Sequence, residues 1–141
     1  MRNNLAITIT SYRYSGFSIR ATAHWNQSNS TVLTSEGEDR ATANFSHARW
    51  VRLEGAAKEN QNAGILIMSH PSNHTHLEKL RTWDKQYNGA IFINFNTVAD
   101  SDWVLQPTLS YTRNYQLFIY DGSLSAEDAD QLWGDYAIAT K

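Results

Sequence analysis

The stretch GILIMSHPSNHTHLEKLRTWDKQYNGAIFINF, residues 64–95, indicates the fold class most directly. At its start, residues 63–69 are almost continuously apolar, as in a central β-strand covered on both sides. At its end, residues 89–95 alternate in the manner of a second strand. His70-Pro71 predicts the end of the first strand, because the residue before a proline is held in extended geometry. The polar segment between the two strands holds three of the five histidines, and we expect chemistry there.

Similar short strands are predicted on both sides of this stretch, separated by turn-forming residues. Residues 41–54 carry mixed side chains on both faces, which predicts a strand with a bulge or with two partly buried faces. One helix is expected from Ser125, with acidic residues in its first turn, to about Ala137. The other predicted strands are residues 5–10, 17–25, 31–35, 103–106 and 115–120. Seven to nine strands with regular turns predict an all-β, antiparallel β-sandwich.

Composition narrows the function classes for what is expected to be a single domain, residues 1–141. There is no cysteine, which excludes disulfides and thiolate metal sites. Charged residues are interspersed at a formal net charge of -2, so we expect no nucleic-acid partner. No apolar run approaches the roughly 20 residues of a membrane span, so no membrane partner is expected. The apolar region within the first 16 residues is too short for a signal peptide, so we expect a cytoplasmic protein or one whose leader was removed.

Histidines give the first candidate site. His74 and His76 lie two residues apart, so an extended backbone would place both imidazoles on one face. Such a pair suits zinc or copper, with His70 or a histidine from another strand as a third ligand. The alternative is a solvated loop with no metal and no cofactor. Asn73 is well suited to hold the turn after Pro71 by hydrogen bonds from its side chain to its own backbone.

Arginine and tryptophan give the second candidate site. Arg81 and Trp83 would share one face of a strand and form a floor for a sugar or an anion. Arg49 shares a face with apolar residues and is expected to point into a cleft. Trp25 is a further candidate for stacking on a sugar. The simpler interpretation of Arg81 and Trp83 is a surface ion pair and a core indole, and that of Arg49 is the solvated face of a sheet.

Two carboxylates are candidates for acid–base chemistry. A glycosidase needs two carboxyl groups at a defined gap, which a sequence does not establish. Glu36, in the turn before Gly37, and Glu78, near the histidines, are the best candidates, with His70 nearby.

An ordered set of short motifs resembles bacterial proteins of the DUF6807 family, often labelled PmoA-like. These motifs are residues 12–17 (YRYSGF), 33–37 (LTSEG), 48–51 (ARWV), 70–73 (HPSN), 111–113 (YTR), 120–122 (YDG) and 132–133 (LW). The resemblance implies a periplasmic or extracellular β-sandwich connected with sugar metabolism. Because family members are usually longer, it also implies that this chain corresponds to their C-terminal half. The chain departs from the family pattern at His74 and His76.

From these observations we expect a sandwich of jelly-roll or mutarotase-like type with one C-terminal helix, packed through Leu132, Trp133 and Tyr136. A half-length sandwich would leave a sheet edge open, so it either closes by itself or forms a homodimer. The expected function is recognition of a carbohydrate in a groove lined by aromatic, arginine and histidine side chains. The alternatives are a glycoside hydrolase and a small metalloprotein with histidine ligands.

Overall fold

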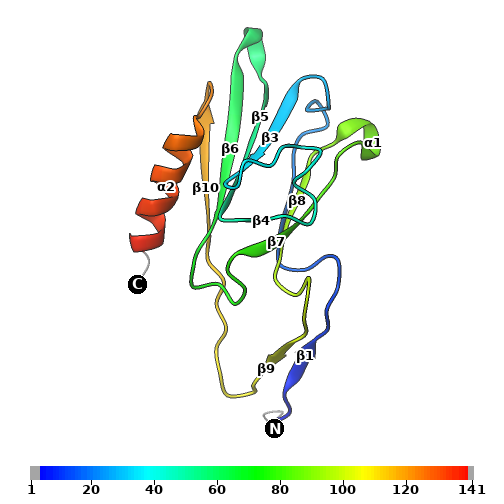
Figure 1. Ribbon diagram of the computed structural model, residues 1–141, viewed down its shortest axis with the longest axis vertical. Helices are drawn as coiled ribbons and strands as arrows, with labels where there is room; N and C mark the ends of the chain where they lie inside the picture. Colours follow the sequence, from blue (N-terminus) through cyan, green and yellow to red (C-terminus); the bar gives the residue numbers. More distant parts are fainter. Residues whose placement is uncertain (1–3, 140–141) are drawn as a thin grey trace.

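Two antiparallel sheets packed face to face form the body of the protein (Figure 1). The structure is a computed structural model, and it describes residues 4–139. The first sheet has the order β10-β6-β5-β3 and carries the long helix on its outer side, so we call it the helix-covered sheet. Its strands are β3 Ser30–Thr34, β5 Trp50–Ala56, β6 Asn62–Ser69 and β10 Tyr115–Asp121.

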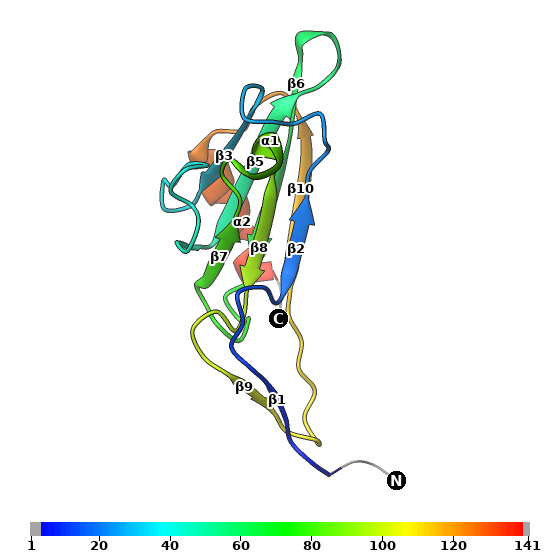
Figure 2. The ribbon, with the colours of Figure 1, turned by 90° about the vertical axis from the view of Figure 1, so that its right-hand side faces the viewer.

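The second sheet has the order β2-β8-β7-β4, and all its neighbours are antiparallel. Its strands are β2 Phe17–Arg20, β4 His47–Ala48, β7 Glu78–Thr82 and β8 Phe92–Asn96. A separate two-stranded ribbon extends from the lower end of the body (Figure 2). This ribbon pairs β1 Ile7–Ile9 with β9 Trp103–Leu105. Two short helical turns complete the fold, η1 Lys58–Asn60 and α1 Gln86–Gly89.

The main core lies between the two sheets, where side chains from both inner faces meet. Alternate residues of each strand point inward, as the period of a β-strand requires. The buried apolar residues of this core are Trp25, Val32, Ala43, Ala48, Val51, Leu53, Ile67, Leu80, Ile91, Ile93 and Phe95. The predicted fold class, an all-β antiparallel sandwich, is confirmed.

The C-terminal helix α2, Ala126–Ala139, covers the other face of the helix-covered sheet. Ser125 caps it, because its hydroxyl accepts a hydrogen bond from the Asp128 backbone N–H at 3.0 Å. Leu132, Trp133 and Tyr136 pack against a second cluster that includes buried Trp50, as predicted. Strand β6 is therefore covered on both sides, which explains its continuous apolar sequence. Within residues 4–139, no helix is long and apolar enough to span a membrane.

Residues 41–54 contain two strands that belong to different sheets, and not the single strand, bulged or with two partly buried faces, that we predicted. β4 pairs with β7 in the second sheet, whereas β5 pairs with β3 and β6 in the helix-covered sheet. Arg49 is the residue between them, and it is where the chain changes sheets. The mixed side chains on both faces of this stretch reflect that crossing.

Candidate functional site

Glu78, a predicted acid–base residue, is fully buried at the start of β7. Its Oε1 accepts hydrogen bonds from the hydroxyls of Thr97 at 2.9 Å and Tyr115 at 2.7 Å. Its Oε2 accepts from the Ser69 hydroxyl at 2.6 Å and the Asn73 amide at 3.4 Å. Burial and the adjacent Glu78 raise the pKa of Tyr115. Both oxygens of Glu78 are thus occupied, and the side chain anchors the turn after β6 to β10 and to the end of β8.

Asn73 holds the same turn through its side chain, but it bonds to Asn114, the residue before β10, and not to its own backbone as predicted. Its amide donates to the Asn114 carbonyl oxygen at 2.9 Å, and its Oδ1 accepts from the Asn114 N–H at 2.7 Å. The side chain is buried, and both ends of the amide are used. Asn73 therefore positions the turn, and it has no surface to offer a ligand.

His70 is buried beside this turn with one ring nitrogen unoccupied. Its Nδ1 accepts from the Ser72 backbone N–H at 3.1 Å and lies 2.7 Å from the Ser72 hydroxyl oxygen. An accepting Nδ1 assigns the proton of the neutral ring to Nε2. Nε2 is buried, and no residue within the described part of the chain hydrogen-bonds to it. The ring packs edge-on against Tyr136 of α2, with centroids 5.1 Å apart.

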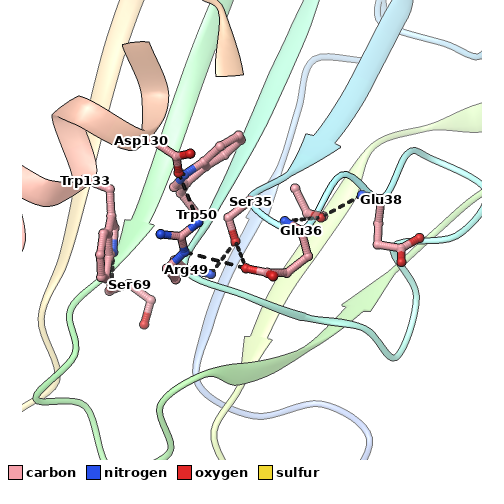
Figure 3. Close-up of polar contacts among 9 residues, drawn as sticks. Ser35, Glu36, Glu38, Arg49, Trp50, Ser69, Asp130 and Trp133 are labelled. Atoms are coloured by element: carbon pink, nitrogen blue, oxygen red, sulfur yellow. Dashed lines mark hydrogen bonds and ion pairs between the residues drawn. The ribbon is translucent and has the colours of Figure 1, made fainter. Parts of the chain in front are cut away.

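Arg49 gathers two carboxylates and an indole where β5 meets α2 (Figure 3). Its guanidinium lies 3.6 Å from a Glu36 oxygen and 3.1 Å from an Asp130 oxygen. The same guanidinium lies over the Trp133 ring, 5.1 Å from its centroid. The His76 ring lies parallel to the Trp133 ring, and the two ring centroids are 6.1 Å apart. We call these five residues, Glu36, Arg49, His76, Asp130 and Trp133, the Arg49 cluster.

The two histidines of the predicted metal site contact different indoles. His74 stacks on Trp103 of the ribbon at 4.2 Å between centroids, whereas His76 lies beside Trp133 of α2. Burial lowers the pKa of His76, and Arg49 and His70 also lower it, while Glu78 acts in the opposite direction. Within residues 4–139, no group of three or more histidine or acidic side chains is arranged to hold a metal ion. A zinc or copper site at His74 and His76 therefore stays a prediction without a third ligand among these residues.

Arginines alternate with aromatic rings over the outer side of the second sheet. The Arg20 guanidinium lies 4.8 Å from the Trp83 ring centroid and 5.6 Å from that of Phe92. Arg81 lies 5.5 Å from the Tyr14 ring and 5.6 Å from the Phe45 ring. We call this surface the aromatic–arginine face, defined by Tyr12, Tyr14, Arg20, Phe45, Arg81, Trp83, Tyr87 and Phe92.

Two hollows open on the aromatic–arginine face. One, of about 340 Å³, lies between Arg20, Trp83 and Tyr87 and has small residues at its floor. The other, of about 380 Å³, lies between Tyr12, Phe45 and Arg81. Both volumes fall near the lower end of those of small-molecule sites. Tyr14 contacts both Phe92 and Arg81, and it therefore links the two hollows.

The structure divides the predicted ligand-binding residues between opposite sides of the sandwich. Arg49 lies with α2 on the helix-covered sheet, whereas Arg81 and Trp83 lie on the outer side of the second sheet. Trp25 belongs to neither side, because its indole is buried in the core and donates to the Ala56 carbonyl oxygen at 2.9 Å. Gly55 permits that approach, since a Cβ there would lie 2.5 Å from the indole. Trp25 is therefore a core residue, and not the sugar-stacking residue that we predicted.

Several residues of both sites were missed from the sequence. Asp130 could have been found, because it lies three residues before Trp133 and so shares its helix face. Tyr14 and Phe45 gave no strand signal, since both lie in irregular segments laid over the second sheet. Tyr87 lies in a short turn and is 75% exposed.

Fold and sites together describe a β-sandwich protein with an arginine-rich aromatic face on one sheet and a helix-bound charged cluster on the other. The chain belongs to DUF6807, a family of unknown function, whose sequence profile matches residues 1–134. No curated protein and no solved structure matches the chain.

Proposed function

We propose that this protein recognises a sugar or glycan on the aromatic–arginine face. The observation that carries the proposal is the hollow between Arg20, Trp83 and Tyr87, where a cation and two rings surround a space of ligand size. Sugar rings bind to proteins through stacking on aromatic faces combined with planar hydrogen-bond donors. Tyr87 offers the stacking surface because its ring is 75% exposed and lies 4.8 Å from that of Trp83.

A ligand with a carboxylate group suits this hollow best. Arg20 is exposed, and within residues 4–139 its guanidinium contacts aromatic rings and no acidic side chain. Its donors are therefore available for a bidentate contact with a carboxylate. Arg81, by contrast, already donates to the Asn44 side-chain oxygen at 2.8 Å and to the Thr82 carbonyl oxygen at 2.7 Å. Arg20 is the better residue for an acidic sugar.

A glycan array and titration calorimetry with neutral and uronic-acid oligosaccharides test this proposal. We expect Tyr87→Ala to weaken binding about fivefold, since one aromatic contact contributes ~1 kcal/mol. We expect Arg20→Gln to weaken binding of the acidic ligands alone. Trp103→Ala is the matched control, because Trp103 is a half-buried indole on the ribbon, away from this face. An array without binding, or affinity unchanged in Tyr87→Ala, would contradict the proposal.

A second candidate function, processing of a glycoside, is favoured by the Arg49 cluster. There, Glu36 and Asp130 contact the same guanidinium, which brings two carboxylates to one surface, and a glycosidase uses a pair of carboxylates. Loss of hydrolysis in Glu36→Gln and Asp130→Asn, with glycan binding on the aromatic–arginine face retained, would support it. Hydrolysis that persists in both variants would exclude these residues as the acid and the base. Correspondence of the chain to the C-terminal half of longer family members stays a prediction.

A further inference from the structure

Strand β10 is an edge strand with apolar side chains exposed on both of its faces. Leu117 and Ile119 pair with Ile67 and Ile65 of β6, so they point to the side of the main core. They are nevertheless 40% and 73% exposed. Phe118 points to the opposite side and is 37% exposed. Seven residues long, β10 has no charged side chain before Asp121.

The sandwich is closed at one end of β10 and open at the other. Tyr115, the first residue of β10, stacks on Phe17 of β2 with centroids 4.8 Å apart, and this contact joins the edges of the two sheets. Further along β10, the exposure of Leu117 and Ile119 shows that the second sheet no longer covers the inner face. A partner that pairs with β10 would bury both faces there at once.

The other sheet edges are protected in the ways that proteins normally use. The outer edge of β3 is bridged by the following loop, with Leu33 paired to Asp39 and the Thr34 N–H bonded to the Glu38 oxygen at 2.9 Å. On the second sheet, β4 has two residues, and β2 has four and ends with Arg20. Among the described strands, β10 alone presents a long unprotected edge.

We propose that two copies of this chain pair antiparallel through β10 and join their four-stranded helix-covered sheets into one sheet of eight strands. The sequence of β10 fits itself about Phe118. In that register Leu117 faces Ile119 of the second copy, and Phe118 faces its own counterpart. Apolar side chains then meet on both faces of the joined sheet, as in favourable cross-strand pairs. A two-fold interface of this kind closes on itself, because the new outer edges are the protected β3 strands.

Charge supports the same register. Arg113 and Asp121 are the only charged residues in the segment 113–125. With Phe118 on the two-fold axis, Asp121 lies opposite Tyr115 of the second copy, and Arg113 is the diagonal neighbour on the same face. Diagonal neighbours are within reach of long side chains. Each Arg113, whose guanidinium donates to the Thr97 hydroxyl of its own chain, would thus lie diagonal to Asp121 of the other copy, once on each side of the apolar centre.

Analytical ultracentrifugation of the full chain in the micromolar range tests the pairing. We expect a species of twice the 16.0 kDa of one chain. Ile119→Lys should weaken the dimer at least about tenfold, because a charge replaces a central apolar contact. Ile138→Lys is the matched control, since Ile138 is 75% exposed and belongs to α2, outside the paired strand. A monomer at every concentration, or a dimer equally stable in Ile119→Lys, would overturn the proposal.

Single-cysteine variants test the register, because the natural chain has no cysteine. Phe118→Cys should form an intermolecular disulfide when diamide oxidises the two thiols, since paired residues lie within bonding range. Gln116→Cys should not, because the two copies of that residue would be about 13 Å apart along the strands. Equal cross-linking of both variants would reject pairing about Phe118. A complex with some other protein in place of a dimer would reject the second copy as occupant.

Discussion

Replacing Glu78 with glutamine separates a structural role from the acid–base role that its sequence position suggested. Glu78→Gln keeps the size of the side chain and exchanges one oxygen for an NH₂ group. Whichever oxygen is replaced, two donors lose their acceptor: Thr97 and Tyr115 on one side, or Ser69 and Asn73 on the other.

The expected cost follows from these contacts. A hydrogen bond to a charged group contributes about 1.5–3 kcal/mol, so two lost bonds amount to about 3–6 kcal/mol. Removing a fully buried charge offsets part of this loss, because its desolvation no longer opposes folding. We therefore expect Glu78→Gln to lower the free energy of unfolding by about 3 kcal/mol, a large part of the 5–15 kcal/mol typical of a domain.

Urea unfolding followed by tryptophan fluorescence and circular dichroism measures this change. Glu59→Gln is the matched control, because Glu59 is exposed in the turn between β5 and β6. Tyr115→Phe removes a single donor, and we expect a loss of about 1.5 kcal/mol. The two changes should be non-additive in the double variant when the glutamine NH₂ group replaces Oε1, since both then remove the bond from Tyr115. If Glu78→Gln lost less than about 1 kcal/mol, the anchoring role argued from its four donors would be wrong.

Three further predictions concern His76, the predicted metal site and Gly16. Burial lowers the pKa of His76 in the folded state, so the unfolded state binds more protons as the pH falls through the ordinary pKa of histidine. Stability should therefore fall as the pH drops from 7 towards 5. Thermal unfolding should show a smaller decline in His76→Gln than in the wild type. Since His74 and His76 lie against different indoles, elemental analysis after dialysis should find less than about a tenth of an equivalent of zinc or copper, and a stoichiometric metal would contradict this. Gly16 has φ +80°, and a Cβ there would overlap the Phe95 carbonyl oxygen. Gly16→Ala should therefore lower the free energy of unfolding, measured in urea, by about 2 kcal/mol or more. Gly122→Ala is the control and should lower it less, because Gly122 has a similar φ but open space around it.

Elements with one dominant signal were predictable from the sequence. Residues 63–69 are continuously apolar, and β6 is indeed covered by the second sheet on one side and by α2 on the other. The helix was expected from Ser125 to about Ala137, and it is observed at Ala126–Ala139 with Ser125 as its cap. In both cases, local propensity and burial favour the same structure.

Alternation that continued past the end of a strand predicted a wrong boundary. Residues 17–25 alternate throughout, yet β2 ends at Arg20. A turn follows, in which the Trp25 N–H bonds to the Thr22 carbonyl oxygen at 3.1 Å. Trp25 still points inward, because its indole N–H reaches Ala56 of a different sheet. Period-two alternation thus reports which side chains face the core, and it does not report the hydrogen bonds that make a strand.

Which residues share a site depends on which sheet each strand joins, and period-two alternation in the sequence does not show this. Arg49 and Arg81 were both predicted to line one groove. In a sandwich, however, two outward-pointing residues lie on the same surface only if their strands share a sheet. The strand change at Arg49 places that residue beside α2, and the pairing of β7 with β8 places Arg81 on the opposite outer surface. That pairing is decided by contacts far apart in the chain, such as Leu80 with Phe95 and Val51 with Ile67, so the division into two sites required the folded structure.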